Sequence, residues 1–298
     1  MSTIASVAPR LNPRRLSPGR IILHGFLIAI CVLWLFPLLW AIFTSLRPIS
    51  DTAHNGYLSW PSQLNLDNYI SVWSQANLPY YYLNTLYIVV PGVLLTLLVS
   101  SMLAFAISQF SWRFNVLVLM LFTAGNLLPQ QVIIVPLYWI YLNTPMPDFL
   151  SDNGLLYDQY IGVVLIHVVF QTGFATFVLS NYMKTITKEI TESALVDGAN
   201  VLRIWWSVIL PLCRPALAAM ATLLFTFMFN DFFWALILLK SGDKRPITSA
   251  LNNLHGAFFT NYNLLAAGSM LAAIPPIIVF VLLQKHFVRG LTLGATKG

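Results

Sequence analysis

Charged side chains are scarce in this sequence. Its 298 residues include 16 Lys and Arg and 10 Asp and Glu, 9% in all, whereas about 25% is usual for a soluble domain. Hydrophobic residues make up 58% of the chain, and the mean hydropathy is +0.74. So few charges cannot cover a globule of this size with polar surface. The composition therefore excludes a water-soluble globular protein and indicates that much of the surface faces membrane lipid.

Cysteine is equally rare. Cys31 and Cys213 both lie in apolar stretches. Two cysteines exclude a disulfide framework and any Cys-rich zinc or iron–sulfur site. We predict that both are small buried hydrophobic residues.

The sequence motifs of common enzyme classes are also missing. The chain has no G-x-x-x-x-G-K-[ST] phosphate loop and no H-E-x-x-H, G-x-S-x-G or C-x-x-C motif. We therefore predict that the chain is not an enzyme and binds neither a metal nor a cofactor. A dense basic stripe is absent as well, which argues against nucleic acid as a partner.

Six apolar intervals are long enough to cross a membrane, which takes about 20 residues in a helix. They lie between residues 20 and 47, within 67–113, from 113 to about 143, at 159–183, at 215–239 and from about 264 to 285. The first has 26 uncharged positions, too many for the apolar core of a cleaved signal peptide. The sequence thus predicts an all-α membrane protein with six transmembrane helices, each a single tilted helix.

The basic residues are distributed unevenly between alternate loops, which predicts the orientation of the chain. With the N-terminus inside, 12 of the 16 Lys and Arg fall on the inner side, and the outer side keeps Arg47, Lys240, Lys244 and Arg245. Basic residues are retained on the cytoplasmic side. We therefore predict two cytoplasmic termini, with residues 1–20 as a basic tail and 21–298 as the transmembrane domain.

A cytoplasmic loop at about residues 184–212 is unusually long and well patterned. Thr187 is a candidate N-cap, and Ile190, Ala194 and Leu195 give a short helix an apolar stripe. Gly198 is a suitable helix stop, and a second helix is predicted from about 201 to 209, broken by Pro211. Helices this short need a packing partner. The residue pattern leaves two alternatives for this partner. The loop is either a hairpin on the lipid headgroups or an element that docks into another subunit.

The same loop resembles a known signature. Glu192-Ser193-Ala194, Gly198 four residues later, and Val208-Ile209-Leu210-Pro211 are similar to the EAA motif of ABC importer permeases, with Ser193 and Val208 in place of the more common Ala and Ile. Residues 284–298 resemble the C-terminus of the maltose-type carbohydrate permeases. Further similarity lies in Asn84-Thr85, Leu127-Leu128-Pro129-Gln130-Gln131 and Phe229-Asn230-Asp231-Phe232.

The resemblance covers about residues 20–298 and implies a set of partners. The EAA loop would dock into a separate ATPase subunit, which would bind ATP and Mg²⁺. Glu192 would pair with basic groups of the ATPase, Gly198 would form the tight turn, Asp197 would cap or pair locally, and Leu210-Pro211 would link the loop to the fifth helix. A second permease, two ATPase subunits and an extracytoplasmic sugar-binding protein would complete an importer in a bacterial inner membrane.

Asp231 is the one acidic residue inside a predicted span, and an intramembrane carboxylate is a candidate for function. With Asn230 and Trp234 it could line a sugar path, because sugars are held by hydroxyl hydrogen bonds and aromatic rings. The alternative is a structural hydrogen bond to a neighbouring helix. For His167, on the fourth predicted helix, we favour such a bond over metal binding.

The function implied by the resemblance is uptake of a sugar or oligosaccharide, driven by ATP hydrolysis on another subunit. One alternative is an ABC permease for glycerol phosphate or another polyol. A second, from a different class, is a secondary transporter driven by H⁺ or Na⁺ through Asp231. The loop at 143–158 is longer and more acidic than expected for the family.

Overall fold

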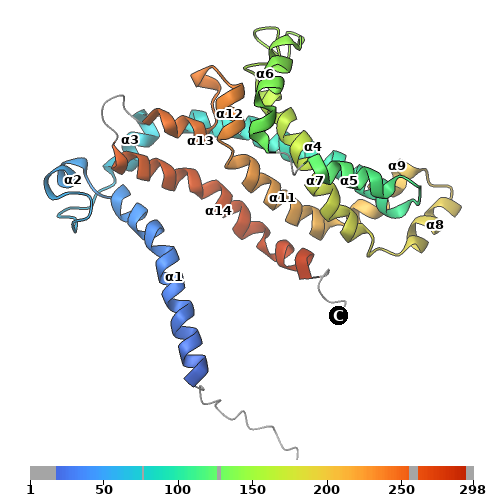
Figure 1. Ribbon diagram of the computed structural model, residues 1–298, viewed down its shortest axis with the longest axis horizontal. Helices are drawn as coiled ribbons and strands as arrows, with labels where there is room; N and C mark the ends of the chain where they lie inside the picture. The colour runs from blue at the N-terminus through green and yellow to red at the C-terminus, as the bar shows by residue number, and fades with distance from the viewer. Residues whose placement is uncertain (1–17, 76, 126–128, 255–260, 293–298) are drawn as a thin grey trace, which may run out of the picture.

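The computed structural model describes residues 18–75, 77–125, 129–254 and 261–292. This part of the chain is helical and forms no strand beyond an isolated bridge between Pro145 and Leu155. Four helices are long and apolar enough to cross a bilayer: α1 (Pro18–Ser45), α4 (Leu78–Gln109), α7 (Tyr160–Met183) and α14 (Tyr262–Thr292). The prediction of an all-α membrane protein is confirmed (Figure 1).

Two further spans form only if each of two bent helix pairs is counted as one. α5 (Asn115–Gly125) meets Gln130–Asn143, made of η1 (Gln130–Ile133) and α6 (Ile134–Asn143), at 86°. The stretch Val201–Leu212 meets α11 (Arg214–Phe229) at 81°. Six spans are therefore compatible with the structure, but the prediction of a single tilted helix is wrong for the third. The 81° bend lies before the predicted fifth span, which starts at residue 215.

The predicted fifth span at 215–239 is interrupted near its middle. α11 ends at Phe229, and a short helix, α12 (Phe233–Leu238), follows. The carboxylate of Asp231 accepts hydrogen bonds from the backbone amides of α12, at 3.3 Å from Trp234 N and 3.1 Å from Ala235 N. A side chain that caps a new helix competes with continuation of the old one. The break therefore follows from Asp231.

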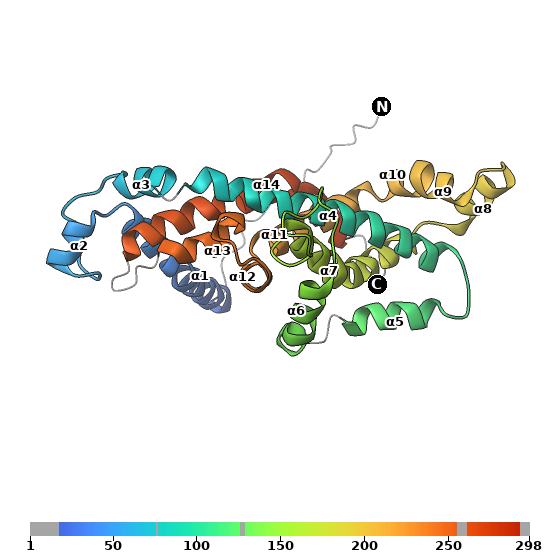
Figure 2. The same cartoon turned by 90° about the horizontal axis from the view of Figure 1, so that it is seen from above.

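Helices α4 and α7 pack against each other and form the centre of the bundle (Figure 2). Both helices bury small side chains: Ser100, Ser101 and Ala104 on α4, and Ala175, Thr176 and Ser180 on α7. Small residues let helix backbones approach closely, which favours association inside a lipid bilayer. α11 packs on this pair and on α14 through an apolar core that includes Met220, Leu224, Met228 and Phe229.

Helix α1 leans away from the rest of the molecule (Figure 1). Ser45, at its C-terminal end, is the only buried residue of this helix. Cys31 is exposed on α1, contrary to prediction, whereas Cys213 is buried as predicted. The exposed apolar side chains of α1 need lipid or another subunit as a cover.

Some of the predictions fall on residues outside the described part of the chain. Of the predicted N-terminal tail, only residues 18–20 are described. Leu127, Leu128 and residues 293–298 lie outside the described residues.

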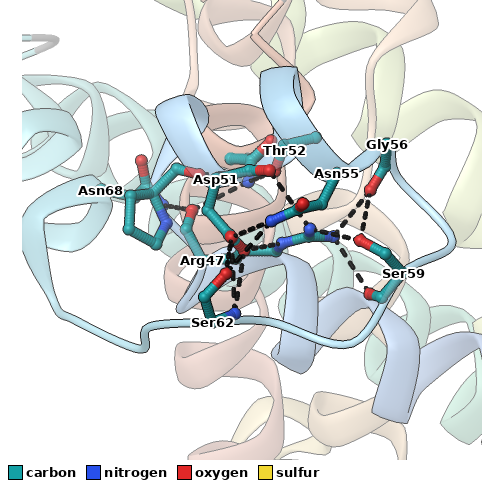
Figure 3. A network of polar contacts seen from close by, with 10 residues as sticks. Arg47, Asp51, Thr52, Asn55, Gly56, Ser59, Ser62 and Asn68 are labelled. Atoms are coloured by element: carbon teal, nitrogen blue, oxygen red, sulfur yellow. Dashed lines mark hydrogen bonds and ion pairs between the residues drawn. The ribbon is translucent and has the colours of Figure 1, made fainter.

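Arg47 organises a buried polar cluster after α1, between α2 (Ile49–Asn55) and α3 (Asp67–Gln75) (Figure 3). Its side chain is 2% exposed, and its Nε donates to Asp51 Oδ2 at 2.5 Å. Its Nη1 donates to the backbone carbonyls of Gly56 and Ser59. The backbone carbonyl of Arg47 accepts from Asn263 Nδ2 at 2.8 Å. This cluster joins the end of α1 to the start of α14. Arg47 is therefore a buried structural residue, although the count of basic residues treated it only as a charge in a loop.

The pKa of Asp51 predicts how this cluster responds to acid. Hydrogen bonds from Ser62 and then from Arg47 hold the pKa of this carboxyl well below its usual value. A depressed folded-state pKa gives stability that is present above the unfolded-state pKa, about 3.9, and is lost as the pH falls through the folded-state value. We expect Asp51→Asn to lower the unfolding temperature at pH 7 and to reduce its fall in acid. Thermal unfolding in detergent from pH 7 to pH 3 measures both effects.

The exposed Asp148 supplies a matched control for this experiment. Asp148→Asn should leave the pH curve of the unfolding temperature close to that of the wild type. Identical acid dependence of Asp51→Asn and the wild type would contradict the prediction.

The acidic loop at 143–158 packs on the chain itself. Lys244, in η3 (Gly242–Lys244), donates to Asp152 Oδ2 at 2.7 Å and holds the pKa of that carboxyl below its usual value. Asp158, with a φ of +61°, accepts from Ser241 N at 2.9 Å. η3 is followed by α13 (Ile247–Ala250) and η4 (Leu251–Leu254). The acidic loop is therefore long enough to contact the segment that follows α12.

Candidate functional site

The patterned loop at 184–212 forms two short helices at the end of the molecule opposite α2 (Figure 2). The first, α8 (Lys188–Val196), follows Thr187 as predicted. The backbone of Thr187 is extended, but its side chain makes no capping hydrogen bond. The predicted position of the helix start is therefore confirmed, although the hydroxyl does not cap it.

Gly198 ends α8 in the left-handed conformation, with a φ of +79°. Its amide donates to Leu195 O at 3.0 Å, and the next amide, of Ala199, donates to Ala194 O at 3.0 Å. These two bonds are those of a Schellman motif, in which a left-handed residue after the helix satisfies its last carbonyls. A residue with a side chain is disfavoured at this φ. The predicted stop at Gly198 is therefore confirmed.

The second short helix starts as predicted but ends later. It consists of α9 (Val201–Ile204), a π-helical turn (Trp205–Ile209) and α10 (Leu210–Leu212), and Asn200 caps it by accepting from Arg203 N at 2.8 Å. The prediction that Pro211 breaks this helix is wrong. The π turn bonds Leu210 N to Trp205 O, one residue wider than an α turn, and the ring of Pro211 follows directly. Such π turns are frequent at functional sites.

The apolar side chains of this loop are largely uncovered. In α8, Ile190 is 36%, Leu195 42% and Val196 88% exposed, so the predicted stripe is not buried within the chain. In the second helix, Leu202 and Trp206 are exposed, whereas Trp205 and Ile209 are buried. Contiguous exposed apolar residues rimmed by polar ones mark an interaction surface.

Acidic side chains surround this apolar surface. Glu189, Glu192 and Asp197 are exposed, and none forms an ion pair with a residue that the structure describes. Asp197 takes part in the turn through its backbone, and the predicted local capping by its side chain is not observed. Ser193 is also exposed, and its hydroxyl donates to Ile190 O within the same helix. The surface can therefore offer unpaired carboxylates to a basic partner.

One buried contact that the sequence did not reveal fixes α8 to the bundle. Thr191 is the buried residue of α8, and its hydroxyl donates to Gln109 Oε1 at 2.9 Å. Gln109 is the last residue of α4, and its Nε2 donates to Met183 O, at the end of α7, at 3.0 Å. One feature of the sequence could have indicated this contact. Gln109 is a lone amide at the end of a long apolar run, where the predicted membrane span ends.

The predicted sugar-path residues do not converge on one space. Trp234 is 1% exposed and packs against Phe170 and Phe233, at centroid distances of 5.5 and 5.1 Å. Asn230 is exposed, and its Nδ2 donates to Thr226 O at 2.9 Å. A buried ring cannot stack on a sugar without repacking. Among Asn230, Asp231 and Trp234, only Asn230 is exposed.

Asp231 makes structural hydrogen bonds, as the alternative interpretation predicted, but its carboxylate bonds to α12, the next helix in the chain. Besides capping α12, it lies beside His167 of α7, with 3.5 Å between Oδ2 and His167 Nε2. The buried Nε2 has no hydrogen-bond partner among the described residues, so the hydrogen bond predicted for His167 is not observed at this atom. In the described part of the chain, no group of three or more His, Cys, Asp or Glu could hold a metal ion.

Substitutions at Asp231 and Asn230 separate the two interpretations. We expect Asp231→Ala to lower the free energy of unfolding by about 1–2 kcal/mol, because it removes a helix cap. Asn230→Ala should change stability by less than about 0.5 kcal/mol, as for other exposed positions. Chemical denaturation in detergent measures both. Equal stability of the two variants would contradict the capping role.

Comparison with known proteins identifies a family and several relatives that this chain resembles. Residues 96–293 match the model of a family described as binding-protein-dependent transport system inner membrane component. The chain is 32% identical to the arabinooligosaccharides transport system permease protein AraQ of Halalkalibacterium halodurans, and the match covers 88% of the chain and 91% of that protein. It is 34% identical to the alpha-glucoside transport system permease protein AglG of Rhizobium meliloti, over 80% of the chain and 62% of that protein.

A solved structure with a similar fold comes from a bacterial ABC transporter involved in the import of the acidic polysaccharide alginate. The TM-score is 0.74 at 23% identity, and the match covers 93% of this chain and all of that one. A second match, with a TM-score of 0.65 at 16% identity, covers 89% of this chain and 93% of the other and comes from the alginate transporter in complex with a periplasmic protein bound to an alginate pentasaccharide. At these identities the likeness shows the fold.

Proposed function

Because the chain belongs to the family of binding-protein-dependent transport system inner membrane components, we propose that it is the permease subunit of an ABC importer for a sugar or oligosaccharide. The observation that carries this proposal is the exposed two-helix loop that follows α7 and leads into α11. Relatives named for arabinooligosaccharide, alpha-glucoside and diacetylchitobiose uptake support a carbohydrate substrate. They favour it over glycerol phosphate or another polyol.

The loop is suited to receive force from a separate ATPase. The chain has no phosphate loop of its own, so ATP and Mg²⁺ bind the partner. Val196, Leu202 and Trp206 dock into an apolar cleft of that subunit, and Glu192 pairs with a basic group there. Gly198 keeps the two helices at a fixed angle, while Ser193 and Ala194 line the docked face. Leu210 and Pro211 carry the motion into α11.

The other subunits follow from this role. A second permease covers apolar surface that this chain leaves exposed, two ATPase subunits hold the two permease loops, and an extracytoplasmic protein delivers the sugar. The distribution of basic residues favours a cytoplasmic location for the α8 end and both termini. The clusters around Arg47 and Lys244 then face the outside of a bacterial inner membrane.

Co-purification of the ATPase tests the proposal. Proline at position 198 is incompatible with a φ of +79°, because its ring fixes φ near −65°. We expect wild type to retain an ATPase subunit in detergent and Gly198→Pro to lose it. Gly198→Asn is the matched control, because asparagine tolerates the left-handed conformation, and it should retain the ATPase. A folded Gly198→Pro that keeps the ATPase would exclude docking through this turn.

Uptake into vesicles separates the proposal from ion-coupled transport. An importer of this kind loses uptake when ATP is depleted and keeps it when an uncoupler removes the proton gradient. The opposite pattern would favour a secondary transporter that uses Asp231. Stimulation of ATP hydrolysis by a panel of oligosaccharides and glycerol phosphate, each with its binding protein, identifies the substrate class.

A further inference from the structure

Gln109 connects three elements at the end of the bundle where the two-helix loop lies. It is the last residue of α4 and is 6% exposed. Its Nε2 donates to the carbonyl of Met183, the last residue of α7, at 3.0 Å. Its Oε1 accepts from the hydroxyl of Thr191 in α8 at 2.9 Å. One amide therefore holds the ends of two long helices and the middle of the docking helix together.

The bond to Thr191 is the main polar attachment of α8. Thr191 is 3% exposed, whereas the other residues of α8 are exposed or partly so. Among the described residues, it makes the one side-chain hydrogen bond between α8 and another element. Leaving a buried acceptor unpaired is unfavourable, which favours keeping this bond.

The opposite end of α4 has a similar connection. Asn84, 2% exposed, donates through Nδ2 to Asp243 O at 2.5 Å and to Arg245 O at 3.0 Å. Its Oδ1 accepts from Tyr160 Oη, at the start of α7, at 2.7 Å. At 1.5 Å per residue, Asn84 and Gln109 are about 38 Å apart along the helix. The α4–α7 pair is thus held together at both ends, with α8 attached at one and the segment 243–245 at the other.

From this arrangement we propose that Gln109 is a positioning residue that transmits the movement of α8 to the α4–α7 pair through its hydrogen bond to Thr191. The proposal rests on the proposed function, in which an ATPase moves α8. A closely packed helix pair moves as one body rather than deforming. The Thr191–Gln109 bond then determines whether closure of the ATPase rotates the pair or moves α8 alone.

Variants of Thr191 test the bond with little change of shape. Thr191→Val keeps the volume and removes the donor, and Thr191→Ser keeps the donor. Gln109→Met removes both hydrogen bonds of the amide. Asn115→Leu is the matched control: Asn115 Nδ2 donates to Ile107 O at 3.0 Å and to Phe110 O at 2.6 Å, near the same end of α4, but makes no hydrogen bond to α8.

The measurement is the number of substrate molecules taken up per ATP hydrolysed, with the complete importer in proteoliposomes. For Thr191→Val and Gln109→Met we expect ATP hydrolysis within about twofold of wild type and a ratio lowered about fivefold, the factor that one hydrogen bond contributes. Thr191→Ser and Asn115→Leu should keep the wild-type ratio.

Two results overturn the proposal. One is an unchanged ratio in Thr191→Val, and the other is a parallel fall of uptake and hydrolysis, which indicates a purely structural bond. If Thr191→Val does not assemble, Thr191→Ser decides: a lowered ratio there excludes the hydroxyl as the connection. Failure of the proposed function is distinguishable, because the wild-type protein would then show no ATP-dependent uptake.

Discussion

Gly162→Val is expected to prevent stable folding of the N-terminal end of α7. Gly162 lies in the first turn of this helix, against the loop at 143–158. A Cβ at this position would lie 2.8 Å from the backbone oxygen of Leu156 and 2.9 Å from Cε1 of Tyr141. The loop carbonyl cannot move freely, because Leu156 N donates to Thr144 O at 3.0 Å. The ring of Tyr141 is also fixed, since its hydroxyl donates to Gly162 O at 2.8 Å.

A graded series at this position measures the effect. Overpacking of a tight site costs about 1–3 kcal/mol and sometimes more, so Gly162→Ala should lose about that amount and Gly162→Val more. Gly25→Ala is the matched control, because a Cβ on Gly25 of α1 meets no atom within 4 Å. There, alanine should leave stability unchanged or raise it by up to about 1 kcal/mol, as expected for a glycine in a helix. Unfolding of Gly162→Ala at the wild-type temperature would show that the loop does not pack on α7.

Asn84→Leu should also be strongly destabilising. The substitution keeps the approximate volume but removes all three hydrogen bonds of a buried amide, to Asp243 O, Arg245 O and Tyr160 Oη. An unpaired buried polar group costs about 1–3 kcal/mol, and two or more are left here, so we expect a loss of about 2–5 kcal/mol. The exposed Asn143, whose amide donates only to Trp139 O in the preceding turn, is the control.

Denaturant unfolding in detergent compares these two asparagines. Asn143→Leu should change the free energy of unfolding by less than about 0.5 kcal/mol. If Asn84→Leu is equally mild, water or detergent satisfies the freed groups, and the connection at this end of α4 contributes little.

Structural features that depend on residues close together in the sequence were predicted well. The turn at Gly198 was predicted because a glycine after a short helix favours a left-handed stop, and the structure has that stop with a φ of +79°. The long spans α4 and α7 were predicted from uncharged length. Two predictions of this local kind were wrong: that Pro211 breaks the second loop helix, and that one helix continues past Asp231. The periodicity of the sequence does not distinguish a π turn or a newly capped helix from these alternatives.

The side-chain contacts depended on residues distant in the sequence. Gln109 and Thr191 are 82 positions apart, and Arg47 and Asn263 are 216 apart. Trp234 was predicted to line a path, yet it is buried because α12 turns it towards Phe170 of α7. Neither hydropathy nor spacing carries information on which helix faces meet.

By itself, the sequence determined that this protein lies in a membrane, where most of its spans are, and the turn between its two loop helices. These properties depend on the transfer of single segments between water and lipid and on backbone preferences at single residues, both of which act locally. Only the tertiary structure decided that Arg47 is buried, that Asp231 caps a helix, and that Gln109 joins α4, α7 and α8. These properties arise because buried polar groups must find partners wherever packing brings them, and that choice is made by the whole bundle.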